Sequence, residues 1–272
     1  MPRAFPVSLA LAALVAVVSC HKVPITGRRQ YNLVPESVMI PLGASSYTST
    51  LSSLTVARQG ENHDQVVQTG RRVARASDAD YDWEFAFVRD ADTVNAWCLP
   101  GGKIAVYSGL LPVARNEAGL AFIMGHEIGH ATAHHSAERL SQQLTVLGGL
   151  AGLNLYLQDR SRLSEEQRTL LLAALGLGAE VGMMLPFSRA HEREADVIGM
   201  MYMARAGYPP AEAVDIWDRM ERATGGSSMP AFLSTHPSYD TRKENLRDWM
   251  DRARKRYQRN KLSKDTTAAL WR

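Results

Sequence analysis

Near the middle of the 272-residue chain lies the stretch LAFIMGHEIGH, residues 120–130. Its first half is apolar and compatible with a helix, so we expect the following histidines to lie on a buried helix. Residues one turn apart share a helical face, so the imidazoles of His126 and His130 can bind one metal ion. Glu127 lies beside them, where it could take a proton from water. Two buried imidazoles without a ligand would be costly, so the pattern predicts a metal site.

The remaining metal ligand has to come from elsewhere in the chain. A catalytic zinc usually takes three protein ligands and leaves a fourth position for water. The metzincin pattern would need a histidine at position 136, but the sequence has Ser136, so this class is excluded. The nearest other histidines, His134 and His135, are expected to lie on the surface.

Two carboxylates downstream have the spacing of one helical turn, Glu192 and Asp196. On one helical face, Glu192 could bind the metal while Asp196 accepts a hydrogen bond from a liganding histidine and fixes its tautomer. Glu194 lies about 200° around the helix from Glu192 and should point elsewhere. Alone, the segment could also be a solvated charged helix, with Arg189 and Arg193 as partners. Combined with the histidine pair, it predicts a third ligand.

The first 19 residues have the features of an export signal. Arg3 is followed by an apolar run over 7–18, shorter than the roughly 18–20 residues that a membrane span needs. The run ends in VVSC, which resembles the bacterial lipoprotein signal and marks Cys20 as the lipidated first residue of a 253-residue mature chain (272 − 19). His21 stands where aspartate would favour the inner membrane, so we expect the periplasmic face of the outer membrane. An ordinary signal peptide with an incidental cysteine is the alternative.

Composition argues against two other classes of protein. Lysine plus arginine number 31 against 28 acidic residues, a balance too even to indicate nucleic-acid binding. There are two cysteines, Cys20 and Cys98, so disulfides cannot hold the fold together.

The pattern along the chain predicts an α+β fold: a single, predominantly helical zincin-type domain over 37–272, preceded by a tether over 20–36. A small sheet should lie beside the metal-binding helix, and two apolar segments should form a buried helical hairpin, with a mobile lid or a membrane-facing pair as the alternative. The expected strands are 83–88, 95–99 and 103–107, the expected helices include 37–57, 64–76 and 116–133, and the apolar segments are 144–157 and 170–185.

Four blocks of the sequence resemble the gluzincin metallopeptidases and occur in the same order as in that family. The resemblance is to the group that includes the CAAX prenyl endopeptidases, HtpX and the periplasmic BepA/LoiP-type proteases. The lipoprotein signal and the segment PITGRRQ resemble the lipoprotein branch of that group. The matching blocks are 95–102 with 108–111, 125–130, 188–196 with Gly199, and 235–237 with Arg242. Cys98 departs from the family, which usually has a small inert residue at that position.

The resemblance implies a zinc endopeptidase with one Zn²⁺ per chain, held by His126, His130 and Glu192. Glu127 would act as general base and pass its proton to the leaving amine. His236 would donate to the oxyanion, act as a fourth ligand that closes the site at rest, or play only a structural role.

The expected substrates are extended, unfolded or misassembled envelope polypeptides, bound as an added strand. The strand expected to receive them consists of Lys103, Ile104, Ala105, Val106 and Tyr107. A chaperone-like assembly factor with weak or latent proteolysis is the main alternative, and the intact Glu127 favours the enzyme. A hydrolase of non-peptide substrates is disfavoured, and a prenyl-protein protease would need a membrane chamber.

Overall fold

The computed structural model describes residues 20–156, 187–223, 231–236, 240–262, 265–268 and 270–271. Helices predominate and one small mixed sheet accompanies them, which confirms the predicted α+β class. The elements are β1 (Cys20–Lys22), β2 (Arg29–Tyr31), α2 (Glu36–Ser52), β3 (Val56–Ala57), α3 (Glu61–Ser77), β4 (Glu84–Val88), β5 (Ala96–Leu99), β6 (Lys103–Tyr107), the 3-10 turn η1 (Ser108–Leu110), α4 (Leu111–Ala114), α5 (Glu117–Thr132), α6 (His135–Tyr156), α8 (Arg189–Arg205), α9 (Glu212–Ala223), α10 (Ala231–Thr235) and α11 (Asp240–Asn260).

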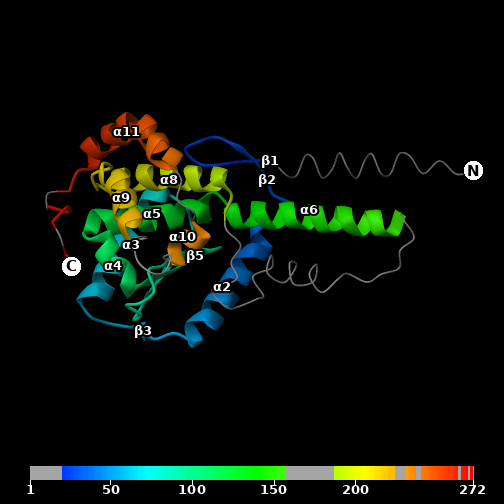
Figure 1. Cartoon of the computed structure of the whole chain (residues 1–272), viewed down its shortest axis with the longest axis horizontal. Helices are drawn as coiled ribbons and strands as arrows, with labels where there is room; N and C mark the ends of the chain where they lie inside the picture. The colour runs from blue at the N-terminus through cyan, green and yellow to red at the C-terminus, as the bar shows by residue number, and fades with distance from the viewer. Residues whose placement is uncertain are drawn as a thin grey trace, which may run out of the picture.

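Helix α5 lies at the centre of the molecule. It packs against α8 on one side and against α3 and β5 on others, while α11 covers the far side of α8 (Figure 1). Asn116 caps its N-terminus by accepting a hydrogen bond from the Gly119 N–H at 2.7 Å. Because neighbours surround α5, nearly all of its side chains are buried, which explains why its sequence is apolar on every face.

Two glycines let α5 and α8 approach each other closely. A Cβ added to Gly125 would lie 2.7 Å from the carbonyl oxygen of Gly199, and a Cβ on Gly199 would lie 2.6 Å from the backbone nitrogen of His126. Either atom would force the helices apart. This close crossing holds the two predicted metal-binding segments against each other.

The sheet has the order β3-β4-β6-β5, with β4 parallel and β5 antiparallel to the central β6. Both faces of β6 are covered: Ile104 and Val106 belong to the main core, and Ala105 and Tyr107 to a second cluster. Tyr47 of α2 belongs to the second cluster, so the sheet lies between α2 and the α3/α5 layer. Strand β5 is therefore the edge strand that borders the metal-binding helix.

Residues 20–36 do not form the free tether that we expected. β1 and β2 pair as an antiparallel hairpin, and Val23 and Gln30 within it are buried. Gln30 donates to the Ala133 carbonyl, so the hairpin is fastened to the end of α5. The expectation failed because these contacts join residues about 100 positions apart, which a local pattern does not reveal. The predicted signal, residues 1–19, lies outside the described part of the chain.

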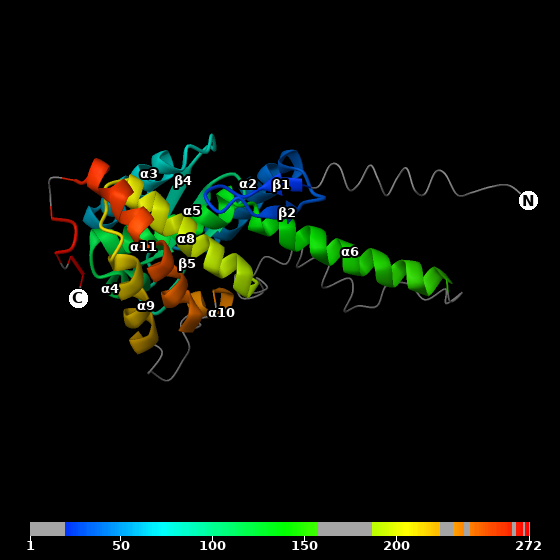
Figure 2. The same cartoon turned by 90° about the horizontal axis from the view of Figure 1, so that it is seen from above.

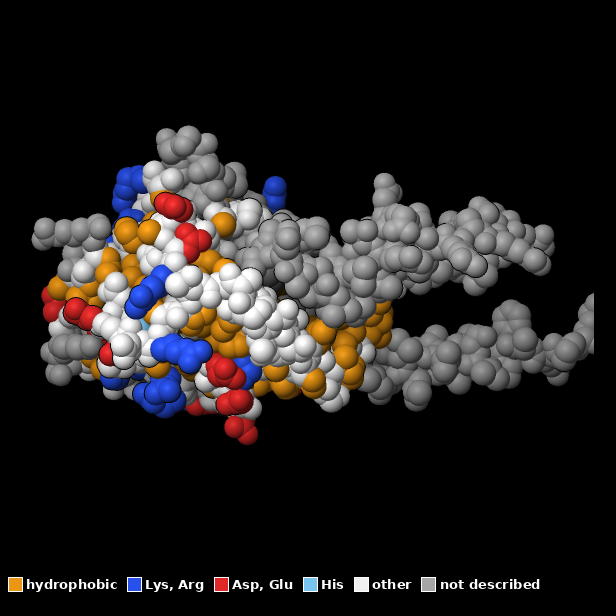
Figure 3. All heavy atoms as spheres, turned by 90° about the horizontal axis from the view of Figure 1, so that it is seen from below, with side chains coloured by type: hydrophobic (Ala, Val, Ile, Leu, Met, Phe, Trp, Pro, Cys, Tyr) orange, Lys and Arg blue, Asp and Glu red, His pale blue; other side chains and the backbone are white. Residues whose placement is uncertain are grey.

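Of the two predicted apolar segments, the first lies in α6, which projects from the rest of the molecule (Figure 2). The second, 170–185, lies outside the described residues, so the hairpin stays a prediction. Within the described part of the chain, no helix combines the length and apolar character needed to cross a bilayer. On the face shown in Figure 3, basic and acidic side chains are interspersed with apolar ones.

Candidate active site

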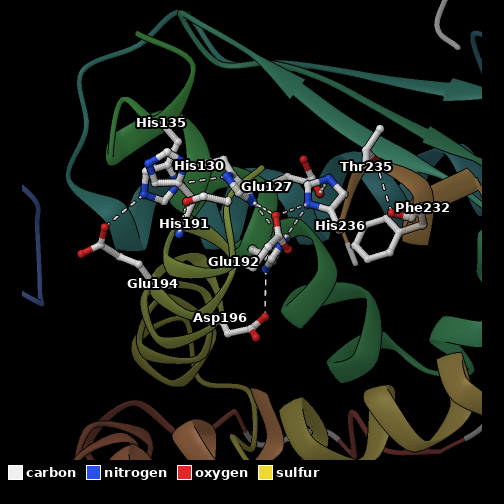
Figure 4. Close-up of polar contacts among 12 residues, drawn as sticks. Glu127, His130, His135, His191, Glu192, Glu194, Asp196, Phe232, Thr235 and His236 are labelled. Carbon is white, nitrogen blue, oxygen red and sulfur yellow. Dashed lines mark hydrogen bonds and ion pairs between the residues drawn. The ribbon is translucent and has the colours of Figure 1, made fainter. Parts of the chain in front are cut away.

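Four buried side chains converge where α5 meets α8. His126 and His130 come from α5, Glu192 comes from the first turn of α8, and His236 follows directly after α10. One ligand atom of each lies within 4.8 Å of those of the others. The structure thus brings together the three predicted metal ligands and His236, which the sequence left open as a fourth ligand. Figure 4 shows His130, Glu192 and His236 turned toward one another.

The spacing of these atoms fits a tetrahedral metal. His126 Nε2 lies 3.1 Å from His130 Nε2 and 3.2 Å from His236 Nδ1. Glu192 Oε1 lies 3.0 Å from His236 Nδ1 and 3.4 Å from His130 Nε2. Metal–ligand bonds of about 2.0–2.1 Å give a tetrahedron with edges of roughly 3.3–3.4 Å, close to these separations. Imidazole and carboxylate ligands with this geometry suit zinc.

The charge states of the ligands also suit a cation. Burial lowers the pKa of His130 well below its usual value, so the ring is neutral and can offer a lone pair. Burial alone would raise the pKa of Glu192, but His236 and Arg242 outweigh it and hold that pKa well below 4.5. The site therefore presents an ionised carboxylate beside a neutral imidazole.

Glu127 lies at the side of this cluster, fully buried. Its Oε1 is 3.4 Å from His236 Nε2 and has no hydrogen-bond partner in the part of the chain that the structure describes. Burial raises the pKa of the Glu127 carboxyl, while a hydrogen bond from the backbone N–H of Cys98 lowers it. A raised pKa suits a group that must both take and return a proton near neutral pH.

Asp196 lies where the sequence analysis placed it. Its Oδ1 is 3.0 Å from His126 Nδ1, which leaves His126 Nε2 facing the ligand cluster. Arg242 donates to both carboxylate oxygens of Asp196, at 2.6 and 2.7 Å, and its Nη1 lies 2.8 Å from Glu192 Oε2. Sequence analysis had listed Arg242 only as part of a resembling block. The structure shows that it neutralises two buried carboxylates behind the ligands.

His135 was expected on the surface, and this was wrong: the residue is completely buried. Its Nδ1 lies 2.9 Å from Nδ1 of His130, and its Nε2 lies 3.1 Å from Glu194 Oε2. In a continuous helix, His135 would lie about 140° around the axis from His130. Instead α5 ends at Thr132, and His134 adopts a left-handed conformation with φ of 50° before α6 begins. This break folds His135 back against the ligand.

Glu194 points away from the metal ligands, as expected, and contacts His135. Sequence analysis gave it no role. A histidine directly after the metal-binding helix, together with a second glutamate on the third-ligand helix, was the available signal.

The prediction that Lys103–Tyr107 receives the substrate as an added strand is wrong. This strand is β6, and both of its edges are already paired, with β4 and with β5. Among the strands that the structure describes, the one at the edge of the sheet next to the active site is β5. Tyr107 N–H bonds the Asn95 carbonyl, so alternation along β5 turns the backbone groups of Cys98 outward, toward Glu127.

Comparison with known proteins supports the same reading of the site. Residues 59–250 match the profile of peptidase family M48, and this span includes all four clustered side chains. The chain belongs to peptidase family M48. The site of this M48 metallopeptidase, with its His126–His130 pair and Glu192, therefore fits zinc both in donor chemistry and by family.

Three relatives show what this M48 peptidase is similar to. It is 34% identical to mitochondrial metalloendopeptidase OMA1 of Schizosaccharomyces pombe, over 85% of this chain and 66% of that protein. It is 35% identical to the Saccharomyces cerevisiae protein of the same name, over 66% and 51%. It is 29% identical to the beta-barrel assembly-enhancing protease of Escherichia coli, over 65% and 36%. The matches thus span between about a third and two thirds of the relatives' length, and the predicted lipoprotein branch stays a prediction.

Proposed function

We propose that this M48 peptidase is an exported zinc endopeptidase that cleaves extended segments of unfolded or misassembled envelope proteins. The observation that carries the proposal is the place of Glu127 between the ligand cluster and the outer edge of β5. A base at this point can reach a peptide bond that lies along the edge strand. The names of the relatives above, metalloendopeptidases and an assembly-enhancing protease, agree with this proposal.

The edge of β5 favours extended substrates. An unpaired strand edge recognises a polypeptide through its backbone groups and reads its side chains only weakly. A small pocket beside β5, lined among others by Cys98, Pro100 and His130, could take one substrate side chain. Folded proteins rarely expose a segment that can pair in this way, whereas unfolded or misassembled ones do.

In the proposed reaction, bound zinc would polarise the water and the substrate carbonyl. Glu127 takes the proton from the water and returns it to the leaving amine. His126, His130 and Glu192 hold the metal, and Asp196 keeps His126 in the tautomer that binds it. Burial around Glu127 excludes competing solvent and raises the pKa of its carboxyl, so the proton can be returned.

Export with a lipid anchor at Cys20 is part of the proposal. Residues 1–19 carry one arginine and a run of apolar or small residues over 7–18, whereas mitochondrial transit peptides are amphipathic and rich in arginine. Acyl chains on Cys20 would hold the protein on the membrane, since each buried CH₂ contributes about 0.8 kcal/mol. Labelling with a palmitate analogue tests this, and a Cys20→Ser variant that still carries label would contradict it.

The test of the function is the Glu127→Gln variant. It should bind zinc as tightly as wild type but cleave casein about 10²–10⁴-fold more slowly, because only the general base is lost. In cells, envelope-protein fragments present with wild type should disappear with Glu127→Gln. Casein cleavage at the wild-type rate, with full zinc content, would contradict the proposed chemistry.

A second candidate function, an assembly factor with latent proteolysis, is favoured by His236. Its Nδ1 takes the fourth corner of the ligand cluster, which a catalytic zinc normally keeps open for water. If His236 closes the site at rest, His236→Ala should raise casein cleavage. If it serves only as an oxyanion donor, the same variant should lower cleavage.

A further inference from the structure

A chain of buried polar contacts leads from His130 away from the metal ligands. His130 Nδ1 meets His135 Nδ1 at 2.9 Å, and His135 Nε2 meets Glu194 Oε2 at 3.1 Å (Figure 4). His130, His135 and Glu194 are each less than a tenth exposed. The contacts join the end of α5, the start of α6 and the second turn of α8.

These contacts favour one arrangement of the protons on the two imidazoles. An ionised Glu194 can only accept, so His135 must donate from Nε2. A neutral His135 then has a bare Nδ1, which can only accept, and His130 must donate from its own Nδ1. Because the two facing Nδ1 atoms share one proton, a His130 that binds the metal through Nε2 must carry that proton, and His135 must accept it. The proton on Nδ1 leaves Nε2 of His130 bare, and this is the atom that faces Glu192 and His126.

The chain does not end at Glu194. Arg28 of the N-terminal hairpin donates from Nε to Glu194 Oε2 at 2.8 Å, and Thr26 donates to the other oxygen. The same guanidinium forms two parallel bonds to Glu138 of α6, at 2.8 and 2.7 Å. Arg28 thus binds the carboxylates of two helices at once. Its planar fork suits this bidentate contact, which a lysine could not reproduce.

From this geometry we propose that His135 and Glu194 are positioning residues that hold His130 in its metal-binding tautomer, and that Arg28 of the N-terminal hairpin keeps Glu194 in place for this task. Asp196 holds His126 in its metal-binding tautomer by direct contact. The second chain reaches its carboxylate through an intervening imidazole, and Arg28 of the β1–β2 hairpin completes it. On this proposal, the hairpin helps to position a metal ligand.

The first test compares two substitutions of His135 in the purified protein. His135→Leu removes the acceptor for His130 Nδ1, whereas His135→Asn keeps an amide oxygen near the place of the ring Nδ1. Zinc affinity is measured by competition with a chelating dye, and the melting temperature of the metal-free protein reports folding. We expect His135→Leu to weaken zinc binding about 10–100-fold and His135→Asn to weaken it several-fold less.

A purely structural role predicts a different result. Both variants would then lower the melting temperature of the metal-free protein and leave zinc affinity within about twofold of wild type. Equal weakening of zinc binding by the two variants would also overturn the proposal, because the acceptor atom would then not matter. The absorption spectrum of the Co²⁺-substituted protein gives a second readout and should shift with His135→Leu more than with His135→Asn.

The second test asks whether Arg28 acts through the same chain. Arg28→Gln should weaken zinc binding in the wild-type background but add little in the His135→Leu background, because the path is already broken there. Arg29→Gln is the matched control, since Arg29 is the exposed neighbour on the same hairpin. Additive effects of Arg28→Gln and His135→Leu, or an equal effect of Arg29→Gln, would separate the hairpin from the metal centre.

Discussion

The two histidines of helix α5 lie one turn apart, yet the structure supports them in different ways. His126 contacts Asp196 directly, and Arg242 holds that carboxylate from α11. His130 reaches Glu194 only through His135, and Arg28 holds that carboxylate from the N-terminal hairpin. Both carboxylates belong to α8, but the two arginines come from opposite ends of the chain. The metal-binding helix is thus fixed by an N-terminal and a C-terminal segment together.

The two supports also differ in their contact with water. The Arg242 side chain is 1% exposed, whereas the Arg28 side chain is 33% exposed. Charge pairs in full burial are strongly coupled, and pairs near solvent are screened. We therefore expect the support of His126 to be rigid and the support of His130 to be softer. The predictions below test this difference.

The largest expected effect is on zinc binding, and it should distinguish the metal ligand Glu192 from the positioning residue Glu194. Glu192→Ala should abolish stoichiometric zinc binding, because it removes one of the atoms that hold the metal. Glu194→Ala, two residues away on α8, should keep zinc but bind it about 10–100-fold more weakly, since it removes only the partner of His135. Metal analysis after dialysis against a weak chelator distinguishes the two. Loss of zinc from Glu194→Ala alone would reverse the assignment of the ligand.

The sequence predicted the first support and missed the second for a physical reason. Glu192 and Asp196 lie on one continuous helix, as do His126 and His130, so the helical period places them correctly. His135 lies beyond a break at His134, where φ is 50°, and a helical period cannot be carried across such a break. The contacts of Arg28 with Glu138 and with Glu194 each join residues more than a hundred positions apart, so no local pattern in the sequence indicates them.

The position of β6 was missed for a related reason. Two short apolar segments on either side of a turn indicate strands, but they do not say which other strands will be their neighbours. Both 95–99 and 103–107 were correctly predicted as strands, yet the parallel pairing of β4 with β6 places 103–107 inside the sheet. Strand β5 is therefore the edge strand, and we expect β5 instead of β6 to pair with a substrate.

A smaller effect is expected on the free energy of unfolding, which should distinguish Arg242 from Arg28. Arg242→Gln leaves Asp196 and Glu192 buried without their cation, so the metal-free protein should lose about 3–5 kcal/mol of unfolding free energy. Arg28→Gln should cost clearly less, because water can reach part of the site and Glu194 keeps its bond from His135. Urea unfolding with chelator present measures both. Equal losses would show that the hairpin side is as rigid as the α11 side.

The smallest effect concerns the pH dependence of the N-terminal support. Burial opposes ionisation of Glu138, but bonds from Arg28 and His191 outweigh it and hold the pKa of this carboxyl well below its ordinary value of 4.5. Gln30 is its other polar neighbour. A carboxyl with a lowered pKa in the folded state contributes stability above its ordinary pKa, and this contribution is lost as the pH falls. Between about pH 6 and about pH 3, the unfolding free energy of wild type should therefore fall more steeply than that of Glu138→Gln. Glu61→Gln removes the same charge from an exposed position on α3 and serves as control. If the two variants flatten the curve equally, the effect comes from overall charge, and the Arg28–Glu138 contact is not what holds the hairpin to α6.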